Sequence, residues 1–235
     1  MSNKVLIIIP AYNEQHSIKS VIEKLLKDAP YADYIVVNDC SKDATIKVLK
    51  ENKFNHINLP LNLGIGGGVQ AGYKYALNNN YDIAVQIDGD GQHDTAYLDT
   101  VITPLLEDEA DIVIGSRFVN KEGFQSSVIR RLGINFLSTL ICLCCGTKVL
   151  DATSGFRAVN RKYIEEYAND YPMDYPEPEA IVKSSLQGAR IAEVPVIMKE
   201  RESGTSSISP MKSIYYMIKV SLAIIICRLT YRRAK

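Results

Sequence analysis

The sequence predicts an α/β fold, in which a mostly parallel sheet is covered by helices on both faces. Short apolar segments alternate with longer amphipathic ones between residues 4 and 115, which is typical of strands that alternate with helices. Polar residues and glycines directly follow several of these apolar segments. Ligands of open α/β sheets bind at this edge, outside the carboxyl ends of the strands.

The expected strands are short, apolar and bounded by polar or turn-forming residues. They comprise residues 4–9, 34–37, 56–59, 83–87 and 111–115. The expected helices comprise residues 14–27, 44–52, 69–79 and 97–107. The first of these helices has an apolar face made of Ile18, Val21, Ile22, Leu25 and Leu26. Ser41 or Asp43 can cap the second.

After Arg117 the alternation stops, and two longer apolar runs follow at residues 134–145 and 214–227. Residues 186–198 between them are expected to add strand material. Neither run reaches the roughly 20 residues that a membrane-spanning helix needs. Each run is therefore either a buried helix or a helix that lies in a membrane interface, and a full span would require residues 215–230 to be stretched. The second run contains a single charge, Lys219, and the four cations that follow it favour the interface: Arg228, Arg232, Arg233 and Lys235.

The composition is that of a globular protein. Hydrophobic residues make up 46% of the 235 residues, and 27 Lys and Arg residues balance 27 Asp and Glu residues. This zero net charge gives no indication of a nucleic-acid partner. The odd number of cysteines, five, indicates a reducing compartment, and the run at residues 5–9 is too short for the core of an export signal.

The segment after residue 87 carries the strongest chemical signal. Asp88 and Asp90 follow an expected buried strand, and Gln92 comes two residues later. Gly89 and Gly91 interrupt the strand and allow the backbone to approach a ligand closely. Carboxylate and amide oxygens suit a hard cation, Mg²⁺ or Mn²⁺, that binds a diphosphate. We therefore expect a metal site at Asp88, Asp90 and Gln92.

The first two strands also end in polar residues. Pro10, Tyr12 and Glu14 follow the first strand, where the tyrosine ring could stack on a nucleobase. Asp39 follows the second strand and could accept a hydrogen bond from the imide N–H of uracil. The structural alternatives are a corner in which Glu14 favours the helix dipole, and a turn with a helix cap.

A glycine-rich stretch at residues 62–72 precedes the expected helix at residues 69–79. We expect a loop whose backbone N–H groups bind phosphate or ribose, with Asn62, Gly64 and Gly66 as candidates. A dinucleotide-binding fingerprint is the weaker interpretation, because the stretch follows the third strand instead of the first.

Several arginines lie in or beside loops that contain glycine or serine: Arg117, Arg130, Arg131, Arg157 and Arg201. A single arginine in such a loop is more often a solvated surface residue. Together, opposite an expected anionic site, they favour phosphate binding.

These motifs together resemble glycosyltransferase family 2, which has the GT-A nucleotide-sugar-binding fold, and within it the polyprenyl-phosphate glycosyltransferases. The motifs that carry the resemblance follow the family order: residues 9–14, 38–43, 62–64, 88–93, 115–117, 153–157 and 201–206. The chain departs from the family at Asn38, where a second aspartate is usual, and at Ser207, where a lysine is common.

The resemblance implies a role for each matching residue. The catalytic residues would be Asp90, Arg117, Asp151 and Arg201. The donor nucleotide sugar would contact Pro10, Tyr12, Glu14, Asp39, Asn62, Gly64, Gly66, Asp88 and Gly89. The acceptor phosphate would contact Arg117, Arg131 and Arg157, and the cation would contact Asp88, Asp90 and Gln92.

The implied reaction is inverting transfer of a sugar from UDP-GlcNAc or UDP-glucose to a polyprenyl phosphate such as undecaprenyl phosphate. The alternative acceptor is a saccharide hydroxyl, which needs a carboxylate base. Candidate bases are Asp151, Asp174, Glu177 and Glu179. A nucleotide-sugar-binding protein without catalysis is a third hypothesis, and the intact metal motif argues against it.

The resemblance also implies two parts of the chain and several partners. We expect a GT-A catalytic domain at residues 1–210 and a C-terminal apolar, basic, membrane-associating helix within residues 211–235. The expected location is the cytoplasmic face of the cell membrane. Self-association and a small membrane-protein partner are further expectations.

Overall fold

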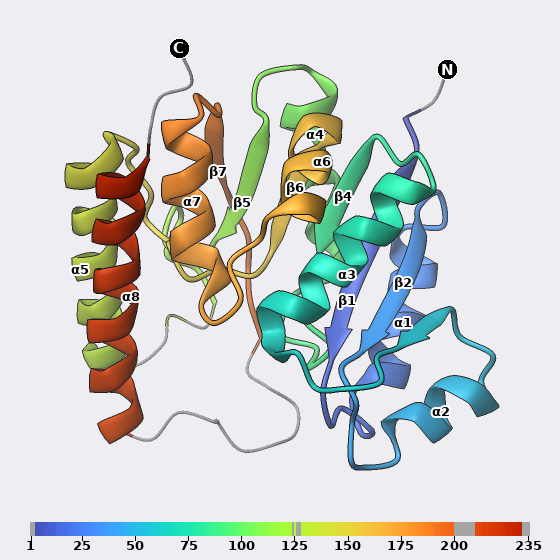
Figure 1. Ribbon diagram of the computed structural model, residues 1–235. Helices are drawn as coiled ribbons and strands as arrows, with labels where there is room; N and C mark the ends of the chain where they lie inside the picture. The colour runs from blue at the N-terminus through green and yellow to red at the C-terminus, as the bar shows by residue number, and fades with distance from the viewer. Residues whose placement is uncertain (1–2, 124, 126–127, 200–209, 232–235) are drawn as a thin grey trace.

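A computed structural model describes residues 3–123, 125, 128–199 and 210–231. In this part of the chain seven strands form one sheet with the order β3-β2-β1-β4-β6-β5-β7 (Figure 1). The strands are β1 (Val5–Ala11), β2 (Asp33–Asn38), β3 (His56–Asn58), β4 (Ile83–Gln86), β5 (Ile112–Ser116), β6 (Arg157–Asn160) and β7 (Ile191–Pro195).

The sheet is parallel except for β6, which runs antiparallel to both of its neighbours. Arg157, the first residue of β6, pairs with Gln86 on one side and with Ile114 on the other. The N-terminal end of β6 therefore lies at the same edge as the C-terminal ends of the parallel strands. A loop at this edge therefore follows each parallel strand and precedes β6.

Helices cover both faces of the sheet. They are α1 (Ile18–Asp28), α2 (Thr45–Glu51), α3 (Gly64–Asn78), α4 (Leu98–Leu106), α5 (Val128–Cys145), α6 (Arg161–Asn169), α7 (Pro176–Leu186) and α8 (Pro210–Thr230), with a 3₁₀ turn η1 (Thr95–Tyr97) before α4. The odd-numbered residues of β1 pack with α1 and α4, and its even-numbered residues pack with α3 and α6. Every residue of β1 is consequently buried, as expected of a strand between two helical layers.

The C-terminal apolar runs form two helices that lie side by side, α5 and α8 (Figure 1). Leu137 and Ile141 of α5 and Val220 and Ile224 of α8 are buried in a third cluster, together with residues of α7. Within the described residues no helix combines the length and the apolar character needed to cross a membrane. The expected membrane role of α8 is treated below as a proposal.

The expected parallel α/β sheet is confirmed, but the glycine-rich loop is not. Residues 64–68 already belong to α3, so the prediction that this helix begins at residue 69 was wrong. Glycine lowers helix propensity, but here it permits close packing. A Cβ atom on Gly66 would lie 2.2 Å from the Pro172 carbonyl oxygen, and one on Gly72 would lie 2.2 Å from Ile8 Cγ2.

Three elements were missing from the sequence-based prediction: β6, α6 and α7. No helix was expected in the acidic, proline-containing stretch at residues 173–179, but α7 begins at Pro176. Proline is favourable in the first turn of a helix, where its missing N–H costs no hydrogen bond, and this explains the discrepancy. Glu177 and Glu179 consequently lie in the first turn of α7.

Candidate active site

Two carboxylates follow β4 in a tight loop at the ligand-binding edge. Asp90 is buried, whereas the Asp88 side chain keeps 35% of its surface exposed. Asp90 Oδ1 accepts a hydrogen bond from the Gln92 backbone N–H at 3.0 Å. The loop turns at Gly91, whose φ of +80° is a conformation that favours glycine. The loop thus fixes the direction of a partly exposed and a buried carboxylate.

The ends of β1 and β2 meet beside the start of α3. Asp39 is buried, and its Oδ1 accepts a hydrogen bond from the Leu63 backbone N–H at 2.7 Å. Asn62 Nδ2 donates to the Asp39 carbonyl oxygen at 2.9 Å. A Cβ atom on Gly68 would lie about 4 Å from Pro10 Cβ and Asp39 Cβ. The structure therefore brings together Pro10, Asp39 and Asn62, three of the residues expected to contact the donor.

The loop after β1 is fixed by the loop after β2. The Asn13 N–H donates to Ser41 Oγ at 3.0 Å, and the Glu14 N–H donates to Thr45 Oγ1 at 2.8 Å. Glu14 Oε2 accepts a hydrogen bond from Ser17 Oγ at 2.7 Å, close to the start of α1. Tyr12 comes directly before Asn13 in the same loop. It is 42% exposed, so its ring is accessible beside the carboxyl ends of the strands.

The structure gives the α3 glycines other roles than the expected phosphate loop. The Gly66 N–H donates to the Met173 carbonyl oxygen at 3.1 Å, so this donor is occupied by the protein itself. Gly64, with a φ of +75°, begins the helix and has open space around its Cα. The Gly66 N–H is therefore not available to a donor phosphate. Packing against residues 172–173 explains why this position is a glycine.

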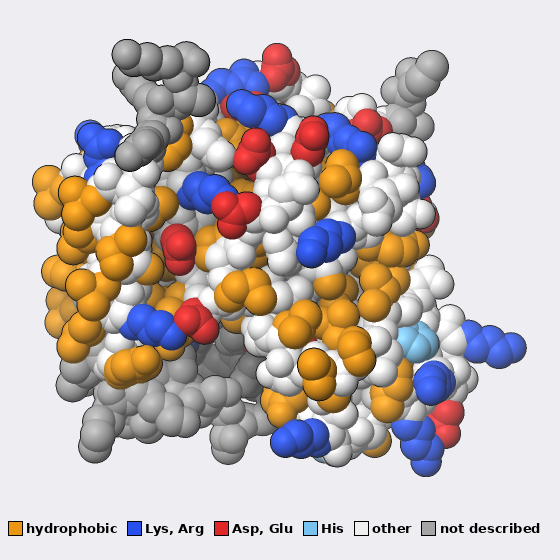
Figure 2. All heavy atoms as spheres, viewed as in Figure 1, with side chains coloured by type: hydrophobic (Ala, Val, Ile, Leu, Met, Phe, Trp, Pro, Cys, Tyr) orange, Lys and Arg blue, Asp and Glu red, His pale blue; other side chains and the backbone are white. Residues whose placement is uncertain are grey.

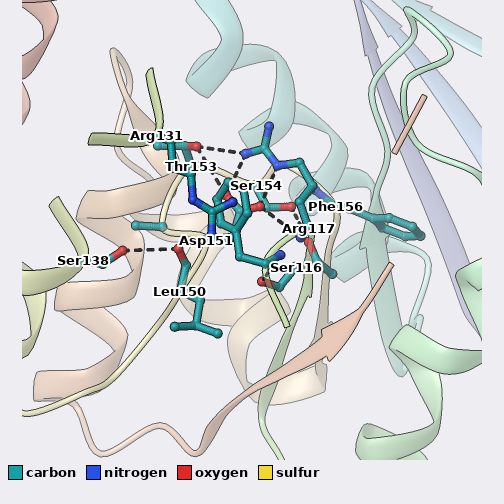
Figure 3. Close-up of polar contacts among 12 residues, drawn as sticks. Ser116, Arg117, Arg131, Ser138, Leu150, Asp151, Thr153, Ser154 and Phe156 are labelled. Carbon is teal, nitrogen blue, oxygen red and sulfur yellow. Dashed lines mark hydrogen bonds and ion pairs between the residues drawn. The ribbon is translucent and has the colours of Figure 1, made fainter. Parts of the chain in front are cut away.

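Arg117 and Asp151 form a buried ion pair on the other side of the site (Figure 3). The Arg117 side chain donates through Nε and Nη2 to the two carboxylate oxygens, each at 2.7 Å. Arg117 Nη2 also donates to Thr153 Oγ1 at 3.2 Å. Asp151 was expected to be catalytic, but it is completely buried and its carboxylate is occupied by Arg117. Asp151 therefore orients Arg117 and is not available as a base.

Arg131 is brought close to Arg117 by a shared aromatic ring. The guanidinium carbons of Arg131 and Arg117 lie 4.4 Å and 5.2 Å from the centroid of the Phe118 ring. Arg131 Nη1 also donates to Gln125 Oε1 at 3.0 Å. Two cations on one aromatic ring are stabilised by its quadrupole and create a local positive potential that suits an anion.

Arg157 was expected to bind the acceptor phosphate, and the structure places it elsewhere. Its side chain is 2% exposed and donates to three backbone carbonyl oxygens, those of Ser154, Glu177 and Ala152. A buried guanidinium with these partners ties the start of β6 to the start of α7. Arg157 is therefore a structural residue beneath the site. Arg201, which was expected to be catalytic, lies outside the described residues.

Gly155 connects the two halves of the site. A Cβ atom at this position would lie 3.1 Å from Asp88 Oδ1 and 3.2 Å from Gln86 Nε2. Gln86 is completely buried, and neither of its amide atoms has a hydrogen-bond partner within the described part of the chain. Gly155 follows Thr153 by two residues, so Asp88 and Arg117 contact one short segment. The carboxylate loop and the arginine pair are therefore neighbours.

Glu177, one of the carboxylates considered as a base, lies in the first turn of α7. Burial raises its pKa to about 7, and nearby Asp88 adds to the increase while Arg157 opposes it. Another candidate on this stretch, Asp174, forms an ion pair with Lys219 of α8. Glu177 is thus a carboxyl group that can change its charge near neutral pH.

The residues at β4 fit a divalent cation that also binds its substrate. Within the described residues no group of three or more His, Cys, Asp or Glu side chains could by itself hold a metal ion. Mg²⁺ typically binds through one or two protein carboxylates together with substrate phosphates and water. Asp88 and Asp90 would provide such a pair, and Gln92 would add an amide oxygen.

The acidic loop, the buried aspartate and the paired arginines lie at the edge where ligands of open α/β sheets bind. The sequence matches the model of glycosyl transferase family 2 over residues 6–168. The chain belongs to this family and is a glycosyltransferase.

Relatives across this family are similar over most of the chain. It is 32% identical to a UDP-N-acetylglucosamine–dolichyl-phosphate N-acetylglucosaminyltransferase of Methanococcus voltae, over 83% of this chain and 86% of that protein. It is 29% identical to an undecaprenyl-phosphate mannosyltransferase of Micrococcus luteus, over 88% of each.

A solved structure shares the fold. Glucosyl-3-phosphoglycerate synthase of Mycobacterium tuberculosis, in complex with Mn²⁺, UDP-glucose and phosphoglyceric acid, matches with a TM-score of 0.74 and 17% identity. The match covers 99% of this chain and 82% of that one. The α/β fold expected from the sequence is therefore that of the GT-A glycosyltransferases.

Proposed function

We propose that the protein transfers a sugar from a UDP-linked donor to a polyprenyl phosphate, with inversion at the anomeric carbon and with Mg²⁺ or Mn²⁺. The observation that carries the proposal is the segment 151–157, which touches Asp88 at Gly155 and Arg117 at Asp151 and Thr153. The expected sites for the donor diphosphate and for the acceptor phosphate therefore lie side by side.

The chemistry follows from this proximity. An oxygen of the acceptor phosphate attacks the anomeric carbon while the bond from that carbon to the diphosphate oxygen breaks, and the electron pair leaves with UDP. The acceptor is already anionic at neutral pH, so no base is needed. Arg117 and Arg131 lower the repulsion between the two anions and hold the acceptor in line.

Asp88, Asp90 and Gln92 would hold the cation at the donor diphosphate. There it would offset the negative charge that develops on the leaving group. Tyr12 and Asp39 would contact the base and ribose from the ends of β1 and β2. With Asp151 fixing its direction, Arg117 is preorganised for phosphate, since an orientation set by the fold costs no further ordering on binding.

The relatives support the choice of acceptor. The proteins of Methanococcus voltae and Micrococcus luteus carry dolichyl phosphate and undecaprenyl phosphate in their names. A polyprenol monophosphomannose synthase of Mycolicibacterium smegmatis is 26% identical over 94% of this chain. These relatives differ in the sugar that they carry in their names, which is GlcNAc in one and mannose in two. They therefore do not identify the donor, and GlcNAc and glucose, the sugars expected from the sequence, are the first to test.

We also propose that α5 and α8 rest on the membrane that holds the lipid. Figure 2 shows hydrophobic side chains gathered over these helices. The exposed ones on α8 recur every three or four residues and so form one stripe: Tyr215, Ile218, Leu222, Ile225, Ile226 and Leu229. Leu132, Phe136 and Leu143 are exposed on α5. The cytoplasmic face, self-association and a small membrane partner stay predictions.

Vesicle flotation tests the membrane proposal. The wild-type protein should float with phosphatidylglycerol vesicles, whereas Leu222→Glu should stay in the soluble fraction. Leu106→Glu, at an exposed leucine on α4, serves as the matched control and should float like the wild type. Equal flotation of all three proteins would contradict the proposal.

A transfer assay tests the reaction. Labelled UDP-GlcNAc and UDP-glucose are incubated with Mn²⁺ and undecaprenyl phosphate, and the product is checked for release of free sugar in mild acid. Asp90→Ala should abolish transfer, and Arg131→Ala should mainly raise the acceptor KM. Normal turnover by Asp90→Ala would falsify the metal assignment.

One observation favours a second acceptor class. Glu177, with a pKa of about 7, could serve as a base for a saccharide hydroxyl. In that case label would move only to saccharide acceptors, and Glu177→Gln would abolish this transfer. With a lipid phosphate as acceptor, Glu177→Gln should retain turnover.

A further inference from the structure

His93, which follows the expected metal ligands, makes contacts that no part of the proposed reaction uses. It is 7% exposed, and its Nδ1 lies 3.0 Å from the backbone nitrogen of Asp88. A backbone N–H can only donate, so Nδ1 must accept this hydrogen bond. The hydrogen of the neutral ring is therefore on Nε2.

The same ring also lies near the carboxylate of Asp88. His93 Nε2 is 3.6 Å from Asp88 Oδ2, which is beyond hydrogen-bonding distance. The hydrogen bond to Nδ1 is therefore the contact that holds Asp88, through its backbone, while Asp90 is oriented by the Gln92 N–H. The other carboxylate oxygen, Oδ1, lies near Gly155, where a Cβ atom would be 3.1 Å away.

The fold leaves His93 little freedom to turn away. Its ring stacks on Phe156, with centroids 5.2 Å apart and an interplanar angle of 22°. Its backbone forms an antiparallel bridge with Met198, and the Lys199 N–H donates to the Gln92 carbonyl oxygen at 2.9 Å. Segments before β6 and after β7 therefore determine where the imidazole lies.

We propose that His93 is a positioning residue that holds the Asp88 carboxylate in the orientation required to bind the divalent cation. The inference rests on the proposed metal site at Asp88 and Asp90. Partners that orient a metal-binding side chain typically change metal affinity about 10- to 100-fold when they are removed. His93 acts through Asp88 and need not touch the cation.

The ring protonation can be measured without metal. Long-range ¹H–¹⁵N correlation spectra of the metal-free protein should show His93 as a neutral ring with the hydrogen on Nε2. A ring with its hydrogen on Nδ1 would overturn the inference, because it could not accept from the Asp88 N–H.

Two substitutions test the Nδ1 contact. His93→Asn keeps an acceptor near the position of Nδ1, whereas His93→Gln places its amide near the position of Nε2 and removes the acceptor for the Asp88 N–H. Mn²⁺ binding, measured by electron paramagnetic resonance without donor or acceptor, should weaken about 10- to 100-fold in His93→Gln. It should recover largely in His93→Asn. A purely structural role predicts equal affinities for the two variants, and that result would overturn the inference.

Asp90→Ala distinguishes this inference from the proposed function. If Asp90→Ala loses Mn²⁺ binding while both His93 variants bind like the wild type, the metal site stands and the role of His93 is wrong. If Asp90→Ala binds Mn²⁺ normally, the metal site itself is wrong. Phe156→Leu, which removes the stacked ring, should weaken Mn²⁺ binding in the same direction as His93→Gln.

Discussion

The Arg117 guanidinium meets both carboxylate oxygens of Asp151 inside the protein, 34 residues away in the sequence. This pair fixes the direction of one of the two arginines proposed to bind the acceptor phosphate. It also removes Asp151 from the carboxylates available as a base. This buried contact thereby favours a phosphate acceptor, whose negative charge an arginine can neutralise, over a hydroxyl acceptor, which must lose a proton to a base.

Removing Asp151 should cost considerable stability. Asp151→Ala leaves Arg117 buried without its partner, and loss of one member of a buried pair typically costs about 3 to 5 kcal/mol. Urea denaturation measures the change in the free energy of unfolding. The double variant Arg117→Leu/Asp151→Leu should lose much less stability and yet fail to use the acceptor. A loss below about 1 kcal/mol in Asp151→Ala would argue against a tight buried pair.

Two glycines of α3 should respond oppositely to alanine. A Cβ atom on Gly66 would lie 2.2 Å from the Pro172 carbonyl oxygen, so Gly66→Ala should destabilise by at least about 1 to 3 kcal/mol. Gly68→Ala meets only ordinary contacts and should be neutral or gain up to about 1 kcal/mol from helix propensity. Thermal melting of both variants checks this, and equal melting temperatures would contradict the proposed packing role of Gly66.

Gly155→Ala should weaken metal binding without unfolding the protein. Its Cβ would press on Asp88 Oδ1 and Gln86 Nε2 at slightly more than 3 Å, a contact that a small shift of these side chains can relieve. That shift moves a proposed metal ligand, so the Mn²⁺ affinity should fall about tenfold or more. A Mn²⁺ titration with a parallel thermal melt separates the two effects, and Asp88→Ala gives the lower limit of binding.

Glu177→Gln should change how stability depends on pH. Burial raises the pKa of Glu177 in the folded state to about 7, above its value in an unfolded chain. The unfolded chain therefore loses the proton first, so this group lowers stability as the pH rises from about 4.5 to 7, and the cost persists above pH 7. Glu177→Gln should melt above the wild type at pH 8, with the difference shrinking toward pH 4.5. Glu109→Gln, at an exposed position, should show no such trend.

The strands and helices of the first half could be predicted because their signals are local. The apolar runs at residues 5–9 and 83–87 and the polar residues after them are visible in the sequence. Strand β6 was not predicted, because it has four residues and opens with Arg157, whose charge hides its burial. Its partners lie on β4 and β5, and no local pattern identifies them.

The position of the candidate site could be predicted, but its internal contacts could not. The order of the motifs indicated which residues gather at the strand ends. The partner of Arg117, the burial of Arg157 and the packing of Gly66 depend on contacts between distant segments, as with Met173 and Gly66. His93 stood within a recognised motif, yet the role proposed for it depends on its contacts with Asp88 and Phe156.

The antiparallel insertion of β6 has a consequence for synthesis on the ribosome. Strand β4 emerges with an open edge, and its neighbour on that side, residues 157–160, is made some 70 residues later. Until then the nascent chain exposes unpaired backbone groups of an apolar strand, a template for mispairing with other chains. Chaperone demand should therefore peak while residues 87 to 157 are being translated, and fall once this strand has entered the sheet.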